Sequence, residues 1–195
     1  PPIEFIDAVL TGPTFDSEEY QEFYLNYSEK NFWGENEENF EKIVKVLELA
    51  GDFEGFKDYI LNNDLINIVV PEGSLLNYTI TEGKEKEALW LIENGIDINA
   101  FDGLELMKAI KKNNNIIAKK LIDEGIVINS REMKDNPLVS AIRFSNAFLV
   151  EELMKNHRNL IVTYSNEYVR NCSVLNIAER MKNEKIINIV KKYLV

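Results

Sequence analysis

The chain reads Gly-Ile-Asp-Ile-Asn-Ala at residues 95–100 and, thirty positions later, Gly-Ile-Val-Ile-Asn-Ser at residues 125–130. Each copy follows closely on a Leu-Ile pair, at Leu91 and at Leu121. A fixed period near thirty residues is typical of proteins built from stacked repeats, in which no single globular core forms. The two segments therefore predict a repeat protein, but they do not indicate what it binds.

Apolar side chains recur at helical spacing ahead of both glycines, in residues 88–94 and 116–124. Charged residues such as Lys119 and Asp123 interrupt the apolar positions and mark the solvent-facing side. Glycine is the residue that most readily adopts a left-handed backbone just past a helix end. The pattern predicts an amphipathic helix that ends near each glycine.

These segments resemble the ankyrin repeat family, whose helices end in Leu-Leu-x-x-Gly-Ala-Asp-Val-Asn-Ala, matched here by residues 91–100. The family's Thr-Pro-Leu-His-x-Ala opening of a first helix is matched by residues 136–141 and in part by residues 175–178. Pro137 suits the first turn of a helix, where its missing N–H needs no partner. The resemblance implies an all-α, ankyrin-type solenoid of four to five helix-turn-helix repeats over residues 42–195.

One spacing rule supports this register: twelve positions separate the family's first-helix Ala from the first residue of its Leu-Leu pair. The rule holds for Thr79 and Leu91, Ala109 and Leu121, Ala141 and Leu153, and Ala178 and Val190. A fifth, degenerate copy is argued upstream, with residues 43–47 in its first helix and residues 51–54 between the helices. The positions where the family prefers glycine between paired helices are here Asn113, Ser145 and Lys182. Over residues 157–172 the spacing lengthens, and we expect irregular loops there.

Nearly all of the net charge of −11 lies in residues 1–41, which carry eleven acids and one base, Lys30. The other 154 residues carry 22 acids and 21 bases. The acidic segment is rich in aromatic residues, unlike a disordered acidic tail, and four of them share one face of a helix capped by Asp16: Tyr20, Phe23, Tyr24 and Tyr27. We expect residues 1–41 to form an acidic helical cap on the end of the solenoid, within a single cooperative domain.

The composition argues against catalysis. His157 is the single histidine, so neither a histidine metal cluster nor a Ser-His-Asp triad can form, and we expect it to take a left-handed backbone after a helix. No glycine-rich phosphate loop is present. We therefore expect no enzyme activity, no metal and no cofactor.

Other classes are disfavoured on composition as well. A sequence pI near 4.7 disfavours nucleic-acid binding, and no apolar stretch approaches the roughly 18 residues that span a bilayer. Cys172 is the only cysteine, which fits a reducing compartment and a cytoplasmic location. The oligomeric state stays open.

Ankyrin proteins usually bind through loop tips and the exposed positions of their first helices. Transfer by position puts Phe101 and Asp102 on one loop tip of this surface. The next loop tip holds Glu132, Met133 and Asp135. The first-helix positions after the alanines are Lys111, Lys112, Arg143 and Phe144.

Two versions of a protein-binding function follow. One is a small acidic inhibitor, such as an immunity protein, that binds a basic toxin or nuclease through the acidic segment. Its contacts are Trp33, Glu35, Glu37, Glu38 and Glu41. The alternative is an ankyrin scaffold, or a secreted effector delivered into a host cell, that recruits a cellular protein through its concave face.

Overall fold

The computed structural model describes residues 37–70, 73–101, 103–128, 136–161, 163–164 and 172–194. The expected aromatic helix near residues 20–27 lies outside these ranges. Contacts divide the chain into two compact units, Pro1–Asp97 and Ile98–Val195, which are described in turn. Their unfolding as one cooperative domain stays a prediction.

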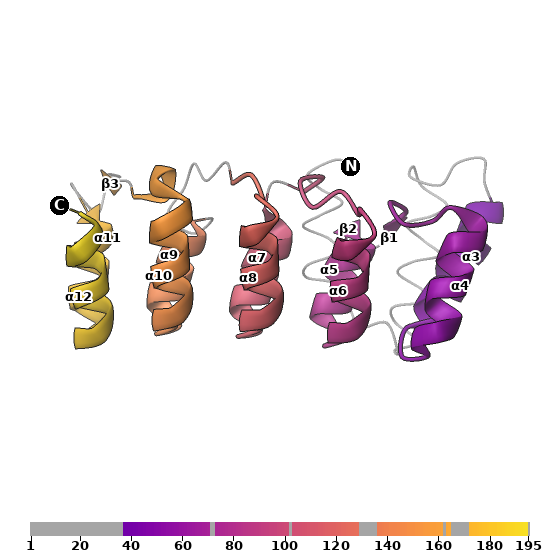
Figure 1. Ribbon diagram of the computed structural model, residues 1–195, viewed down its shortest axis with the longest axis horizontal. Helices are drawn as coiled ribbons and strands as arrows, with labels where there is room; N and C mark the ends of the chain where they lie inside the picture. The colour runs from indigo at the N-terminus through magenta and orange to yellow at the C-terminus, as the bar shows by residue number, and fades with distance from the viewer. Residues whose placement is uncertain are drawn as a thin grey trace. The chain divides into compact units, whose positions relative to one another are not determined.

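The described part of the first unit contains two helical pairs, and one short strand pair joins them (Figure 1). The helices are α3 (Glu37–Leu49), α4 (Phe53–Asn63), α5 (Leu75–Thr81) and α6 (Glu85–Glu93). Strands β1 (Val69–Val70) and β2 (Gly73–Ser74) pair antiparallel. The pair α3 and α4 confirms the expectation of two helices in this upstream segment, with Asp52 capping the second; its descent from an ankyrin repeat stays a prediction.

Aromatic side chains hold the two pairs of the first unit together. The rings of Phe56 in α4 and Trp90 in α6 meet edge to face, with centroids 6.2 Å apart. The Tyr78 hydroxyl of α5 donates a hydrogen bond to the Leu47 carbonyl of α3 across 3.4 Å. Both contacts therefore join one helical pair to the other.

Three helical pairs make up the described part of the second unit. They are α7 (Leu104–Lys111) with α8 (Asn115–Asp123), α9 (Pro137–Arg143) with α10 (Ala147–Asn156), and α11 (Val174–Met181) with α12 (Glu184–Tyr193). Figure 1 shows α8, α10 and α12 side by side, with α7, α9 and α11 behind them. Contacts run within each pair and between like helices of successive pairs. Three hairpins are thus stacked along two rows of helices.

The residues related by the twelve-residue spacing rule lie in the protein interior. All eight residues that it relates are fully buried: Thr79, Leu91, Ala109, Leu121, Ala141, Leu153, Ala178 and Val190. Each helical pair of the register therefore contributes one small first-helix residue and one larger second-helix residue to the apolar interior.

The predicted helix ends are also confirmed. Gly95 and Gly125 adopt φ values of +86° and +78°, and a Cβ atom at either position would meet nothing within 4 Å. The backbone conformation, and not lack of space, therefore favours glycine there. At the start of α9, Pro137 occupies the first turn, and Asn136 accepts hydrogen bonds from the Leu138 and Val139 amides.

The described residues are mostly helical, as expected, with two exceptions in the stretch predicted to be irregular. A 3-10 helix, η3 (Arg158–Leu160), follows α10, and strands β3 (Thr163–Tyr164) and β4 (Cys172–Ser173) pair antiparallel. The expectation of a left-handed His157 is wrong, since its φ is −129°. The chain runs directly into η3, where the Leu160 amide donates to the His157 carbonyl across 3.1 Å.

Among the described residues, no helix combines the length and the apolar composition that crossing a bilayer requires.

Replacing Leu121 by Ala should lower the free energy of unfolding by about 2 to 5 kcal/mol, because it opens a cavity in the interior between hairpins. Denaturant unfolding measures the change. The exposed Val127 supplies a matched control, and Val127→Ala should change stability by less than about 0.5 kcal/mol. A loss below about 1 kcal/mol for Leu121→Ala would contradict the helix register.

Candidate partner-binding surface

The first-helix positions predicted to bind a partner are exposed at the carboxyl ends of two neighbouring helices. Lys111 ends α7 and Arg143 ends α9, and the next residues, Lys112 and Phe144, begin the turns into α8 and α10. All four are exposed, and Phe144 keeps 55% of its surface in water. The structure therefore places these four candidates at equivalent positions of two helices that contact each other.

A left-handed residue shapes each of these turns. Asn113, Ser145 and Lys182 have φ values of +55°, +56° and +55°, and Gly83 has +68° at the equivalent position of the first unit. For a residue with a Cβ atom this conformation costs roughly 1–2 kcal/mol. The same left-handed backbone thus occurs at four turns, and at three of them the residue is not glycine.

Asn146 joins two successive turns. Its Oδ1 caps α10 by accepting from the Leu149 amide, while its Nδ2 donates to Asn113 Oδ1 across 2.9 Å and to Asn115 Oδ1 across 2.7 Å. The side chain is buried, so both its donor and its acceptor groups need partners. These bonds fix the turn between α7 and α8 directly beside the turn between α9 and α10.

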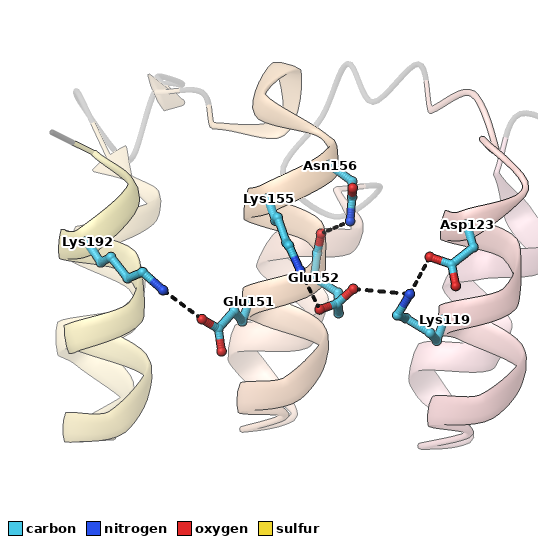
Figure 2. A network of polar contacts seen from close by, with 7 residues as sticks. All are labelled: Lys119, Asp123, Glu151, Glu152, Lys155, Asn156 and Lys192. Carbon is cyan, nitrogen blue, oxygen red and sulfur yellow. Dashed lines mark hydrogen bonds and ion pairs between the residues drawn. The ribbon is translucent and has the colours of Figure 1, made fainter.

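Charges on the second helices form a different surface (Figure 2). On α10, Glu152 extends toward Lys119 of α8, 3.4 Å away, and Glu151 extends toward Lys192 of α12, 2.9 Å away. Lys119 also pairs with Asp123 of its own helix, and Lys155 lies 3.6 Å from Glu152. Carboxylates on the central helix thus pair with lysines of both neighbouring hairpins.

The same pairs shift proton affinities in the expected directions. The hydrogen bond from Lys192 holds the pKa of Glu151 below its ordinary value, and that bond in turn raises the pKa of Lys192. The pKa of Lys119 is raised chiefly by its hydrogen bond to Asp123. Both effects favour the charged forms, so this surface stays ion-paired at neutral pH.

Phe101 was expected to be exposed on a loop tip, and this expectation is wrong. The side chain is only 8% exposed. Two hydrogen bonds hold the loop around it: the Leu104 amide donates to the Phe101 carbonyl, and the Val127 amide donates to Asn99 Oδ1 across 2.7 Å. Phe101 therefore packs as part of the second unit and presents little surface to a partner.

The remaining candidates fall mostly outside the described residues: Trp33, Glu35, Asp102, Glu132, Met133 and Asp135. Glu37 and Glu38 open α3, although their side chains are not described, and Glu41 is exposed on the same helix. Their roles stay predictions. Of the acidic group, only Glu41 has a described side chain.

Three exposed apolar residues near the same turns were missed by the sequence analysis: Ile116, Phe148 and Met181. Ile116 and Phe148 each lie two residues beyond a helix-capping asparagine, Asn114 and Asn146. By hydropathy alone, both residues resemble core positions. Their common offset from an N-cap asparagine was the sequence signal that could have identified them as exposed.

The described residues hold no cluster of three or more His, Cys, Asp or Glu side chains suited to a metal ion. No protein-family model matches the chain, and comparison with curated proteins gives no significant match.

Replacing Ser145 by Gly should raise the free energy of unfolding by about 0.5 to 1 kcal/mol, because glycine relieves the left-handed strain at some cost in chain entropy. Thermal and denaturant unfolding measure the gain. Ser145→Ala keeps the strain and should give none. An equal gain from both variants would show that the turn backbone is not the cause.

Partial burial lowers the pKa of His157 from its ordinary value of 6.5, and its Nε2 is buried with no hydrogen-bond partner among the described residues. The folded protein therefore binds the proton less readily than the unfolded chain does. Well above pH 6.5, His157 is neutral in both states and does not change the free energy of unfolding. As the pH falls through 6.5 toward the folded-state pKa, the unfolded chain binds the proton first, so the free energy of unfolding decreases.

Unfolding measured from pH 7.5 downward should show a steeper loss for the wild type than for His157→Gln, which cannot titrate. Parallel pH profiles for the two proteins would contradict the assigned effect of burial.

Proposed function

We propose that this chain is a non-enzymatic protein-protein interaction module of the ankyrin type. Support for the architecture comes from the stacked hairpins, from the buried spacing rule and from turns with the backbone that the family builds with glycine. The observation that carries the function is Phe144, an aromatic side chain held exposed beside Arg143 on a packed helical frame.

Energetics support a binding role for this site. Full burial of one phenylalanine side chain contributes about 2 kcal/mol when a partner supplies a pocket, and large aromatic and arginine side chains dominate measured interfaces. The frame beneath Phe144 is already ordered by the buried residues of α9, so little additional ordering is required on binding. The scaffold version of the function, which recruits a cellular protein, therefore has the stronger support.

The acidic inhibitor is the second candidate. A charge of −10 concentrated in residues 1–41 would steer a basic partner, such as a toxin or nuclease, toward this segment. Glu41, exposed on α3, is the described member of that group. Both candidates imply a protein partner and fit a cytoplasmic location.

Affinity capture with the full chain as bait separates the two candidates. Under the scaffold version, Arg143→Glu combined with Phe144→Ser should lose the captured partner, while Glu35→Lys, Glu37→Lys and Glu38→Lys together should keep it. The inhibitor version requires the reverse. Val127→Ser, which alters an exposed apolar residue elsewhere, is the control. Identical recovery by all four baits would contradict both candidates.

A further inference from the structure

The turns between first and second helices of the second unit form a surface that we call the turn edge, comprising residues 111–116, 143–148 and 180–185. Four large apolar side chains are exposed on it: Ile116 at 57%, Phe144 at 55%, Phe148 at 46% and Met181 at 40%. Ile116 and Phe148 are each the second residue of α8 and α10. Phe144 and Met181 occupy equivalent positions at the ends of α9 and α11. The apolar exposure therefore repeats from hairpin to hairpin.

Cations accompany these apolar residues. Six exposed basic residues lie on the turn edge: Lys111, Lys112, Arg143, Arg180, Lys182 and Lys185. Within the described part of the chain, none of the six forms an ion pair, although the charge of Lys185 helps to lower the pKa of Glu151. The acids beside them are Glu179 and Glu184, both exposed.

This arrangement contrasts with the second-helix surface of the same unit. There, Lys119 and Lys192 are paired with carboxylates of the neighbouring hairpin (Figure 2). Cations near a helix carboxyl end interact favourably with its dipole, which accounts for a basic residue in the last turn of each first helix of the second unit. The dipole does not account for Phe144 and Phe148 beside them.

The turn edge is continuous across neighbouring hairpins. Asn146 reaches from the second turn to Asn113 and Asn115 of the first, so Ile116 adjoins the segment that holds Phe144 and Phe148. The third turn lies next to the second, because α9 contacts α11 and α10 contacts α12. One ligand segment can therefore contact several hairpins together.

We infer that the turn edge binds an acidic amphipathic peptide segment of a partner protein. The partner's carboxylates would pair with Lys112 and Arg143, and its apolar side chains would cover Phe144 and Phe148. This inference rests on the proposed interaction function and specifies the chemistry of the partner. Charge complementarity is its basis, because the cations of the edge form no ion pair with a carboxylate in the part of the chain that the structure describes.

Nucleic acid fits the turn edge less well. Duplex DNA carries one negative charge per roughly 1.7 Å of its axis, which the net charge of −11 on this chain would repel over a long range. Ile116 and Met181 also provide no aromatic face on which a base could stack. A peptide with a few carboxylates avoids most of that repulsion and supplies apolar side chains that match these residues.

The test is a selection from a phage-displayed library of random peptides against the full chain, followed by affinity measurement on the enriched peptides. We expect enrichment of Asp and Glu together with aromatic and aliphatic residues. Lys112→Glu with Arg143→Glu should weaken binding of these peptides about tenfold or more, and so should Phe144→Ser with Phe148→Ser. Affinity should fall as salt rises.

Matched controls are Lys191→Glu and Val127→Ser, which change an exposed cation and an exposed apolar residue away from the turn edge. Both should keep affinity within about twofold of the wild type, a change of less than about 0.5 kcal/mol. Thermal unfolding of every variant confirms that the fold is retained.

Selected peptides without acidic enrichment, or binding that both edge variants leave unchanged, would overturn the inference. Oligodeoxythymidine that binds the edge more tightly than any selected peptide would assign the surface to nucleic acid instead. Neutral or basic peptides that still depend on Phe144 would overturn the acidic chemistry and leave the interaction module standing. The module itself fails only if affinity capture also shows no dependence on the altered residues.

Discussion

Close packing of small and large residues between successive hairpins is the constraint on which the rest of the second unit depends. Ala109, Ala141 and Ala178 are fully buried in the first helices, opposite larger buried residues of the second helices. A methyl side chain lets neighbouring first helices approach closely, and an interior packed to normal density tolerates little displacement. The positions of the turns, and hence of every exposed residue on them, follow from this packing.

Burial explains which parts of the structure the sequence predicts well. Helix periodicity reports directly which side chains face the interior, so the twelve-residue spacing from Ala141 to Leu153 matches full burial at both ends. Glycine at positions 95 and 125 and proline at 137 likewise act through their own backbone geometry. In each of these cases, the residue and its neighbours in the sequence were enough to predict the local structure.

Loop residues depend on distant partners, and there the sequence was a poorer guide. Phe101 is buried in a loop whose neighbouring residue Asn99 accepts a hydrogen bond from the Val127 amide, 28 residues along the chain. The double role of Asn146, as a helix cap and as a bridge to Asn113, is likewise a property of two adjacent hairpins. No pattern within one repeat encodes such a contact.

The two polar surfaces of the second unit have different physical consequences. Ion pairs between α8, α10 and α12 neutralise charge, and exposed pairs of this kind contribute little to stability because water and salt screen them. The turn edge leaves its cations and aromatic residues available. This difference between the two surfaces is the reason for proposing that the turn edge, and not the ion-paired surface, binds a partner.

A double-mutant cycle between Leu121 and Leu153 tests the central claim most directly, because these residues come from second helices of adjacent hairpins that contact each other. If the hairpins share one packed interior, the two substitutions to alanine should be non-additive by at least about 0.5 kcal/mol in the free energy of unfolding. Strict additivity within experimental error would show that the hairpins are energetically independent and would contradict this account.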